Sequence, residues 1–168
     1  SITVLSSLIQ YQRGGLEPAL MESLLQIRQL LEPAFAGLAA ENRTEEQVRE
    51  FCELLEKEES ADRRHIQKIT DYDFEFHLLI AMASGNTVYP LLMNSFRPVY
   101  TNLSGQFFKD PGVTDVVHRY HRDMVRAIKA GNVKKANSVM KNILQHGEKH
   151  LRQIIDRENP AVPFPGGG

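Results

Sequence analysis

The stretch ADRRHIQKITDYDFEFHLLIAMASGN, residues 61–86, decides the fold class of this chain. Its apolar side chains recur three or four residues apart, as in Phe76, Ile80 and Ala83, which places them on one face of an α-helix. The Ser84-Gly85-Asn86 sequence that follows is a typical helix end, because glycine readily adopts the left-handed conformation that closes a helix. The pattern therefore predicts a helix over residues 61–83.

The same spacing of apolar residues continues on both sides of this helix. Before it, Thr44-Glu45-Glu46-Gln47 is a capping box, in which the threonine and glutamine side chains each bond a free backbone amide at a helix start. After it, we predict one helix that Thr87 caps and Pro98 bends. No segment shows the polar–apolar alternation that is typical of strands. These patterns predict an all-α protein, an antiparallel bundle of six to seven helices, at residues 17–40, 44–60, 61–83, 87–108, 114–129 and 133–157.

The composition describes one globular domain without a nucleic-acid surface of its own. The chain has 168 residues, with 20 basic and 21 acidic side chains and a formal net charge of −1. A domain that binds DNA by itself normally carries a positive excess, so we expect DNA binding to belong to a part of the protein outside this chain. Residues 16–158 are the predicted domain, between a linker or short helix at 1–15 and a disordered tail at 159–168 that is rich in proline and glycine.

Two further features bear on the cellular compartment. No apolar run approaches the roughly 18 residues of a membrane span, and no signal-peptide pattern is present. We therefore expect a cytoplasmic protein with no membrane partner. The single cysteine, Cys52, excludes a disulfide framework within the chain, and its place in a helical pattern predicts a buried structural thiol.

Asp73 and His77 are the residues whose spacing carries the most chemical information. They are one helical turn apart, which puts them on the same face with roughly 5–6 Å between their Cβ atoms. The apolar neighbours Phe76 and Ile80 place the pair close to the buried face. Carboxylates and imidazoles are common ligands of transition metals, so the pair is a candidate metal site. By spacing alone, an ordinary ion pair or hydrogen bond is favoured over a metal.

The other histidines divide into two groups. His121 and His146 belong to the last two predicted helices, where both can face one cavity, whereas His65, His118 and His150 are predicted to be solvated. The sequence contains no nucleophile elbow and no glycine-rich phosphate loop. Aromatic residues concentrate in the middle of the chain, where they either line an apolar pocket or belong to the core: Tyr72, Tyr89, Phe96, Tyr100, Phe107 and Phe108.

Several short motifs stand out by their order and spacing: Ile27-Arg28-x-x-Leu31-Glu32, Asp73-x-x-Phe76-His77, Ala83-Ser84-Gly85-Asn86, and His121 followed by Ala127-Ile128 and Gly131-Asn132. Together they resemble the FCD domain, which is the C-terminal effector-binding half of FadR-subfamily GntR transcription regulators. The likeness covers about residues 20–155. It implies a dimeric bundle of six or seven helices, with a central cavity where one Asp and three His hold a divalent metal, such as zinc or nickel, that receives a small carboxylate.

The resemblance implies that Asp73, His77 and His121 are metal ligands. The fourth ligand of the family falls on Ile143, whose apolar side chain cannot coordinate a metal. We predict that His146, almost one turn later on the same helix, takes its place. Otherwise water or effector oxygens complete the coordination.

The resemblance also implies an effector site and partners. Arg28 matches an arginine of the first helix that contacts the acid, and Asn86 and Tyr100 are predicted as further effector contacts. We expect a homodimer that reaches DNA only through an N-terminal winged-helix domain outside this chain. We expect no enzymatic activity.

Three alternatives stay open. The segment from Ala83 to Pro111 resembles the fatty-acid-responsive members of the subfamily, which lack the metal site and bind long-chain acyl-CoA. A metal-dependent enzyme needs a general base besides the ligands, and Glu75, on another side of the predicted helix, is the one candidate. A purely structural helical module would have a dry core and no metal.

Overall fold

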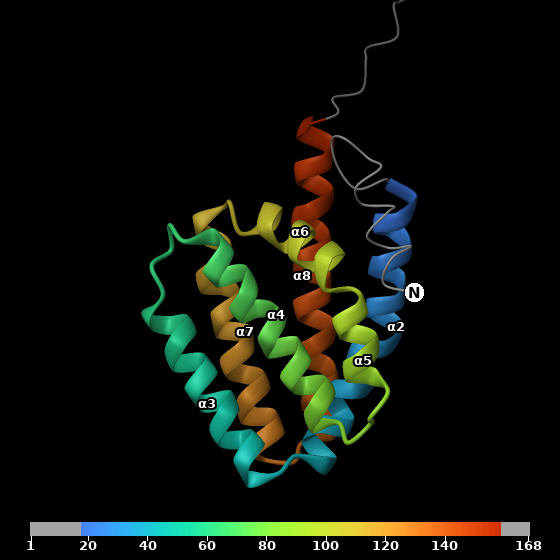
Figure 1. Cartoon of the computed structure of the whole chain (residues 1–168), viewed down its shortest axis with the longest axis vertical. Helices are drawn as coiled ribbons and strands as arrows, with labels where there is room; N and C mark the ends of the chain where they lie inside the picture. The colour runs from blue at the N-terminus through green and yellow to red at the C-terminus, as the bar shows by residue number, and fades with distance from the viewer. Residues whose placement is uncertain (1–17, 159–168) are drawn as a thin grey trace, which may run out of the picture.

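The computed structural model describes residues 18–158, and these residues form seven α-helices and no strand (Figure 1). The prediction of an all-α bundle of six to seven helices is therefore confirmed. The predicted linker at 1–15 and tail at 159–168 lie outside the described residues, so the domain boundaries remain predictions. The helices are α2 (Pro18–Asn42), α3 (Glu45–Ser60), α4 (Ile66–Ala83), α5 (Tyr89–Ser95), α6 (Arg97–Phe107), α7 (Pro111–Lys129) and α8 (Val133–Glu158).

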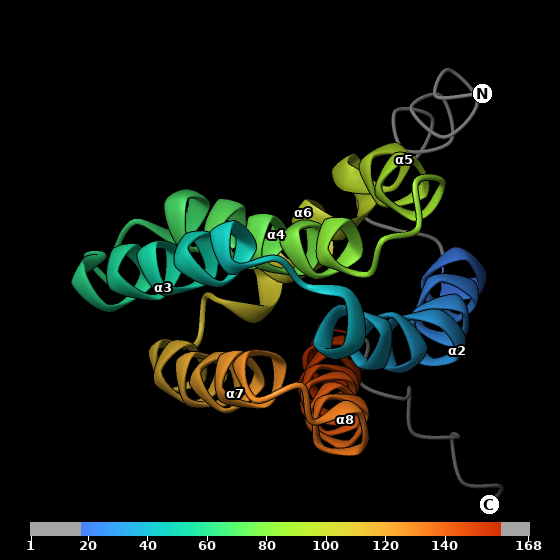
Figure 2. The ribbon, with the colours of Figure 1, turned by 90° about the horizontal axis from the view of Figure 1, so that it is seen from below.

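Five long helices form a closed ring. Each packs on the next in the order α2, α4, α3, α7 and α8, and α8 packs on α2 to close the ring. Figure 2, which looks at the molecule from below, shows α3 and α4 on one side, α7 and α8 opposite, and α2 joining the two pairs. The short helices α5 and α6 pack on α4, and α6 also contacts α8. Side chains that point inward from five different helices therefore meet in the centre of the ring.

Helices α2 and α8 approach closely because small residues line their contact. Ala36 and Ala40 of α2 and Ala136 of α8 are fully buried. A Cβ atom at Gly37 would meet Val133 Cγ1 at 3.2 Å, which is tighter than ordinary van der Waals contact. The distance between packed helices depends on the side chains at their contact, so these small residues bring the two backbones together. Large buried side chains fill the rest of the interior, among them Phe51, Phe74, Phe76, Ile80, Met124, Ile128 and Met140.

The ends of α3 and α4 test three local predictions. The Thr44 hydroxyl accepts a hydrogen bond from the Gln47 backbone N–H, and the Gln47 side chain accepts one from the Thr44 N–H, so the capping box is confirmed. Gly85 has a φ of +77°, which confirms the predicted helix stop. Helix α4 starts at Ile66 rather than at residue 61. The Asp62 carboxylate accepts the Arg64 backbone N–H at 3.0 Å, and such local bonds stabilise a turn in place of a helix.

The segment after α4 differs from its prediction in two ways. Thr87 does not cap α5, because the Asn86 side-chain oxygen accepts the backbone N–H groups of Val88 and Tyr89 at 3.0 and 2.9 Å. The predicted single helix is two helices, α5 and α6, which meet at Phe96. Pro98 lies in the first turn of α6, because its ring and missing N–H do not permit the helix to continue from α5.

The prediction that Cys52 is a buried thiol is wrong, because Cys52 is exposed on α3. Its neighbours Phe51 and Leu54 are buried and form the inward face of the helix. Periodicity locates such a face only to within about one position, which is enough to misplace a single residue. Between residues 18 and 158, no helix combines the length and apolarity that crossing a membrane requires.

Candidate metal centre and effector cavity

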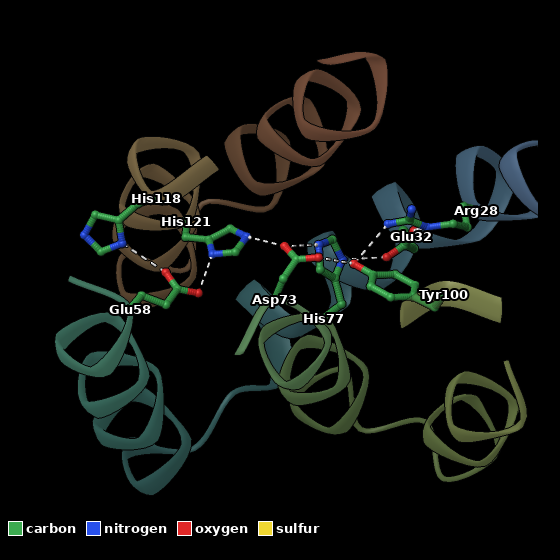
Figure 3. A network of polar contacts seen from close by, with 8 residues as sticks. All are labelled: Arg28, Glu32, Glu58, Asp73, His77, Tyr100, His118 and His121. Carbon is green, nitrogen blue, oxygen red and sulfur yellow. Dashed lines mark hydrogen bonds and ion pairs between the residues drawn. The ribbon is translucent and has the colours of Figure 1, made fainter. Parts of the chain in front are cut away.

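Asp73, His77 and His121 meet inside the helical ring (Figure 3). Asp73 and His77 lie one turn apart on α4, His121 lies on α7, and all three are buried. Each residue offers one ligand atom, and these atoms all lie within 4.8 Å of one another. Asp73 Oδ1 is 3.9 Å from His77 Nε2 and 3.4 Å from His121 Nε2. The structure thus brings together three of the four residues predicted as metal ligands.

Each of the two imidazoles contacts a carboxylate through its Nδ1 atom, while its Nε2 atom faces Asp73. His77 Nδ1 lies 2.6 Å from Glu32 Oε1 of α2, and His121 Nδ1 lies 2.7 Å from Glu58 Oε1 of α3. An ionised carboxylate accepts the N–H of the ring, which keeps the proton on Nδ1 and leaves Nε2 directed at Asp73. Histidines that bind metals usually have such a carboxylate or carbonyl partner on the other nitrogen.

Glu32 and Glu58 are functional candidates that the sequence alone did not single out. Glu32 follows Arg28 by four residues, and a salt bridge joins them, so this spacing was a usable signal. Glu58 carries no comparable signal, because α3 is rich in glutamate and most of these side chains face solvent. Only the packing of α3 against α7 distinguishes it.

The site concentrates ionised groups in the interior. Burial raises the pKa of Asp73, but the nearby imidazoles of His121 and His77 and the Tyr100 hydroxyl outweigh it and hold the pKa at about 2. Burial likewise raises the pKa of Glu32, yet Arg28 and His77 lower it to about 2. Burial lowers the pKa of His121, and the carboxylates of Glu58 and Asp73 together raise it to about 9. The buried carboxylates are therefore ionised near neutral pH and require positive partners.

The donor set fits a divalent transition metal. One carboxylate oxygen and two imidazole nitrogens are ligands that zinc and nickel accept. His121 Nε2 is buried and, within residues 18–158, has no aligned hydrogen-bond partner, although Asp73 Oδ1 is 3.4 Å away. Either a proton on His121 or a cation between the three ligands can balance the Asp73 charge there. Metal binding and protonation of the imidazole would therefore compete.

Arg28 and Tyr100 adjoin the three ligands. The Tyr100 hydroxyl donates a hydrogen bond to Asp73 Oδ2 at 2.8 Å, which leaves Oδ1 directed at the histidines. Arg28 Nε donates to Glu32, and Arg28 Nη2 lies 3.4 Å from the Tyr100 hydroxyl. The Arg28 guanidinium also lies 4.5 Å from the centre of the Tyr100 ring. Two of the three predicted effector contacts therefore lie beside the candidate metal site.

A cavity opens beside this cluster, and His146 lies on its wall. Its lining includes Arg28, Asp73, His77, Ile143 and His146. The space available to the centres of water-sized molecules is about 40 Å³, enough for roughly three waters. His146 is partly buried and is not among the three clustered ligands. Burial, aided by His150 and Lys149, lowers the pKa of His146, which favours the neutral imidazole that a metal binds.

Asn86 does not join the site. Its side chain is exposed in the loop before α5, where it accepts backbone N–H groups, and it does not line the cavity. Glu75, the candidate general base, is also exposed and away from the cavity.

The prediction that His118 is solvated is wrong. It is buried, and its Nδ1 lies 3.0 Å from Glu58 Oε2. One carboxylate thus contacts both His118 and the candidate ligand His121.

Comparison with known proteins agrees with this architecture. The FCD domain family matches residues 23–146 of the chain. The chain is also similar to two proteins named fatty acid metabolism regulator protein. The one from Shewanella sp. (strain MR-4) is 23% identical over 139 residues, which is 83% of this chain and 56% of that protein. The one from Proteus mirabilis (strain HI4320) is 24% identical over 132 residues, which is 79% of this chain and 52% of that protein.

The matches to the relatives and to the family cover different shares of the proteins compared. The chain spans about half the length of the curated relatives it matches. The family match, by contrast, covers most of the chain and includes Arg28, Asp73, His77, His121 and His146. The all-helical ring and the motifs quoted from the sequence agree with it, and the chain belongs to the FCD domain family.

Proposed function

We propose that this chain is the effector-binding and dimerisation domain of a FadR-subfamily GntR transcription regulator, and that it senses a small carboxylate at a metal site. The meeting of Asp73, His77 and His121 inside the ring carries the proposal. Each imidazole has a carboxylate at its Nδ1 atom, which leaves its Nε2 atom facing Asp73. A cation is the group that the three converging ligand atoms fit jointly.

In this proposal some residues of the site bind the metal and others bind the acid. Asp73, His77 and His121 hold a divalent cation, zinc or nickel, and His146 from α8 is the fourth ligand. The bound cation supplies a positive charge with coordination positions open to carboxylate oxygens. Arg28 lines the same cavity and offers a second positive charge to the acid. Tyr100 holds Asp73 in place through its hydroxyl.

The proposed regulation follows from differential binding. Metal and acid together would contact side chains of α2, α4, α7 and α8, which are four of the five ring helices. An acid that binds one arrangement of two protomers more tightly shifts the population toward that arrangement. A homodimer would transmit this change to winged-helix domains that precede this chain, and so alter how they match their DNA half-sites.

Metal analysis and calorimetry test the proposal. We expect one divalent metal per purified chain, and heat of binding for small mono- or dicarboxylates that disappears when a chelator strips the metal. Protein that binds neither metal nor acid would overturn the proposal. Long-chain acyl-CoA that binds equally well before and after stripping would support a metal-free acyl sensor instead, an alternative suggested by the similarity to proteins named fatty acid metabolism regulator protein.

Glu58→Gln is expected to weaken metal binding by about 10- to 100-fold, the usual effect of losing a carboxylate behind a metal-binding histidine. The amide keeps the size of the side chain but removes the charge that holds the His121 Nδ1 proton. A competition titration against a chelating dye measures the change. The matched control is Glu59→Gln, an exposed position on the same helix, which should leave the affinity unchanged. Equal affinities in both variants would show that Glu58 does not position a ligand.

A further inference from the structure

Two histidines of α8, His146 and His150, form a second group of potential metal ligands, which we call the outer pair. They are four residues apart, so they lie one above the other on the same face of the helix. Both side chains are partly buried, and His146 lines the metal cavity whereas His150 does not. The outer pair therefore extends from the wall of the cavity toward solvent.

The separation of the two rings suits a single metal ion. A metal bound to an imidazole nitrogen at about 2.0–2.1 Å lies roughly 3.2 Å from the centre of that ring. Two such rings at about 90° to each other, the angle between adjacent ligands of a square-planar or octahedral metal, have centres roughly 4.5 Å apart. The centres of the His146 and His150 rings are 4.5 Å apart.

The His150 ring also has the hydrogen bond that metal-binding histidines usually make. Its Nδ1 lies 3.1 Å from the backbone carbonyl oxygen of His146. A carbonyl oxygen only accepts hydrogen bonds, so Nδ1 carries the proton and donates it. In the neutral ring this leaves the lone pair on Nε2, the nitrogen that can then bind a metal.

Aromatic side chains hold both rings of the outer pair. The ring of Phe107, a buried residue of α6, meets His146 at 5.7 Å and His150 at 5.6 Å, nearly at right angles to each. Tyr120 of α7 also contacts His146, with 5.7 Å between ring centres. Because three helices already restrict these side chains, metal binding would cost less conformational entropy than it costs at two free surface histidines.

We propose that His146 and His150 bind a second divalent transition metal ion, copper(II) or nickel(II), at the outer edge of the metal cavity. Both ions accept imidazole ligands and favour adjacent nitrogens about 90° apart. Among residues 18–158, the one group of three or more potential ligands that converge is Asp73, His77 and His121, so water completes the coordination at the outer pair. With two protein ligands, this ion binds more weakly than the inner one and is expected to leave during purification.

The outer ion would compete with the inner cation for His146. A neutral imidazole has one unprotonated nitrogen, so His146 binds only one of the two ions at a time. While the outer ion is bound, water or acid oxygens would take the fourth position of the inner cation. The outer pair does not itself require the inner cation, so it can be tested without it.

Calorimetry with nickel(II) on the Asp73→Asn variant tests the proposal, because this variant lacks the inner carboxylate ligand. We expect one nickel ion per chain. Addition of His150→Ala should weaken that binding by at least about tenfold, since a lost ligand costs no less than a lost partner of a ligand. The matched control is His65→Ala, which removes an exposed histidine at the start of α4 and should leave the affinity unchanged. Thermal melts of each variant confirm that the fold is intact.

Nuclear magnetic resonance locates the ion. Paramagnetic nickel should broaden the ring-proton signals of His146 and His150 first, and those of His65 only at much higher concentration. Equal affinities with and without His150, or no nickel binding to Asp73→Asn, would overturn the outer site. Metal and acid that still bind the wild-type chain in that case would leave the proposed function intact. Nickel bound at the outer pair of a chain whose inner cluster takes up no metal would instead overturn the proposed function alone.

Discussion

Asp73→Asn is expected to weaken divalent metal binding by more than about a hundredfold. This loss is larger than the one expected for a residue such as Glu58, which hydrogen-bonds a ligand but does not bind the metal. Asp73 is the one carboxylate among the three clustered ligands, and its Oδ1 faces both imidazoles. Asparagine keeps the size of the side chain and can still accept the Tyr100 hydroxyl, so the packing of α4 should survive. The lost charge leaves two neutral imidazoles, which bind a cation far less tightly. A chelator competition titration measures the affinity.

Two comparisons make this result specific. Asp71→Asn removes a carboxylate from another side of the same helix, where it pairs with Gln67, and should leave metal affinity unchanged. His146→Ala should weaken binding less than Asp73→Asn, because His146 lines the cavity but stands outside the cluster of three. Wild-type affinity in Asp73→Asn would exclude a metal site built on α4.

Phe76→Ala is expected to lower the free energy of unfolding by about 3–5 kcal/mol, the usual cost of deleting a buried phenyl ring. Phe76 is fully buried and links the core to the candidate site. Its ring stacks on His121 with 3.8 Å between ring centres, and it packs edge-on against Phe51 at 5.6 Å. Removal of the ring leaves a cavity that backbone shifts close only in part. Equilibrium unfolding of the metal-free chain in urea measures the loss.

Met82→Ala provides the comparison on the same helix. Met82 is 50% exposed, so its truncation should change stability by no more than about 0.5 kcal/mol. Phe76→Ala should also weaken metal binding, because the His121 ring loses the surface that orients it. Similar stabilities for the two variants would contradict the placement of Phe76 in the core.

The helices themselves were predictable because helix formation depends on local spacing. The capping box at Thr44 and the left-handed Gly85 each depend on residues within one turn, and both were read from the sequence. The predicted helix starts are wrong where a side chain bonds the nearby backbone in place of a further helical turn. At Asp62 a side-chain bond to the backbone delays the start of α4, and before α5 the Asn86 side chain, rather than Thr87, accepts the backbone N–H groups of Val88 and Tyr89. The sequence pattern alone does not show whether such a bond or a further helical turn is more stable.

The candidate site was only partly predictable. Asp73 and His77 share a helix face, so their pairing follows from a spacing of four residues. His121 entered through family resemblance, because no spacing connects residues 73 and 121. Glu58 was not recognised, since nothing local distinguishes it from the other glutamates of α3. Its role depends on where α7 places His118 and His121.

The sequence by itself determined that the chain is all-helical, where most helices end, and that Asp73 and His77 face the same way. These properties arise from interactions within about one turn, which adjacent residues encode directly. Only the tertiary structure decided that Glu32 and Glu58 support the two imidazoles, and that Arg28 and Tyr100 lie beside Asp73 and His77. Those contacts join different helices, so their geometry depends on how the entire ring packs and not on any single segment.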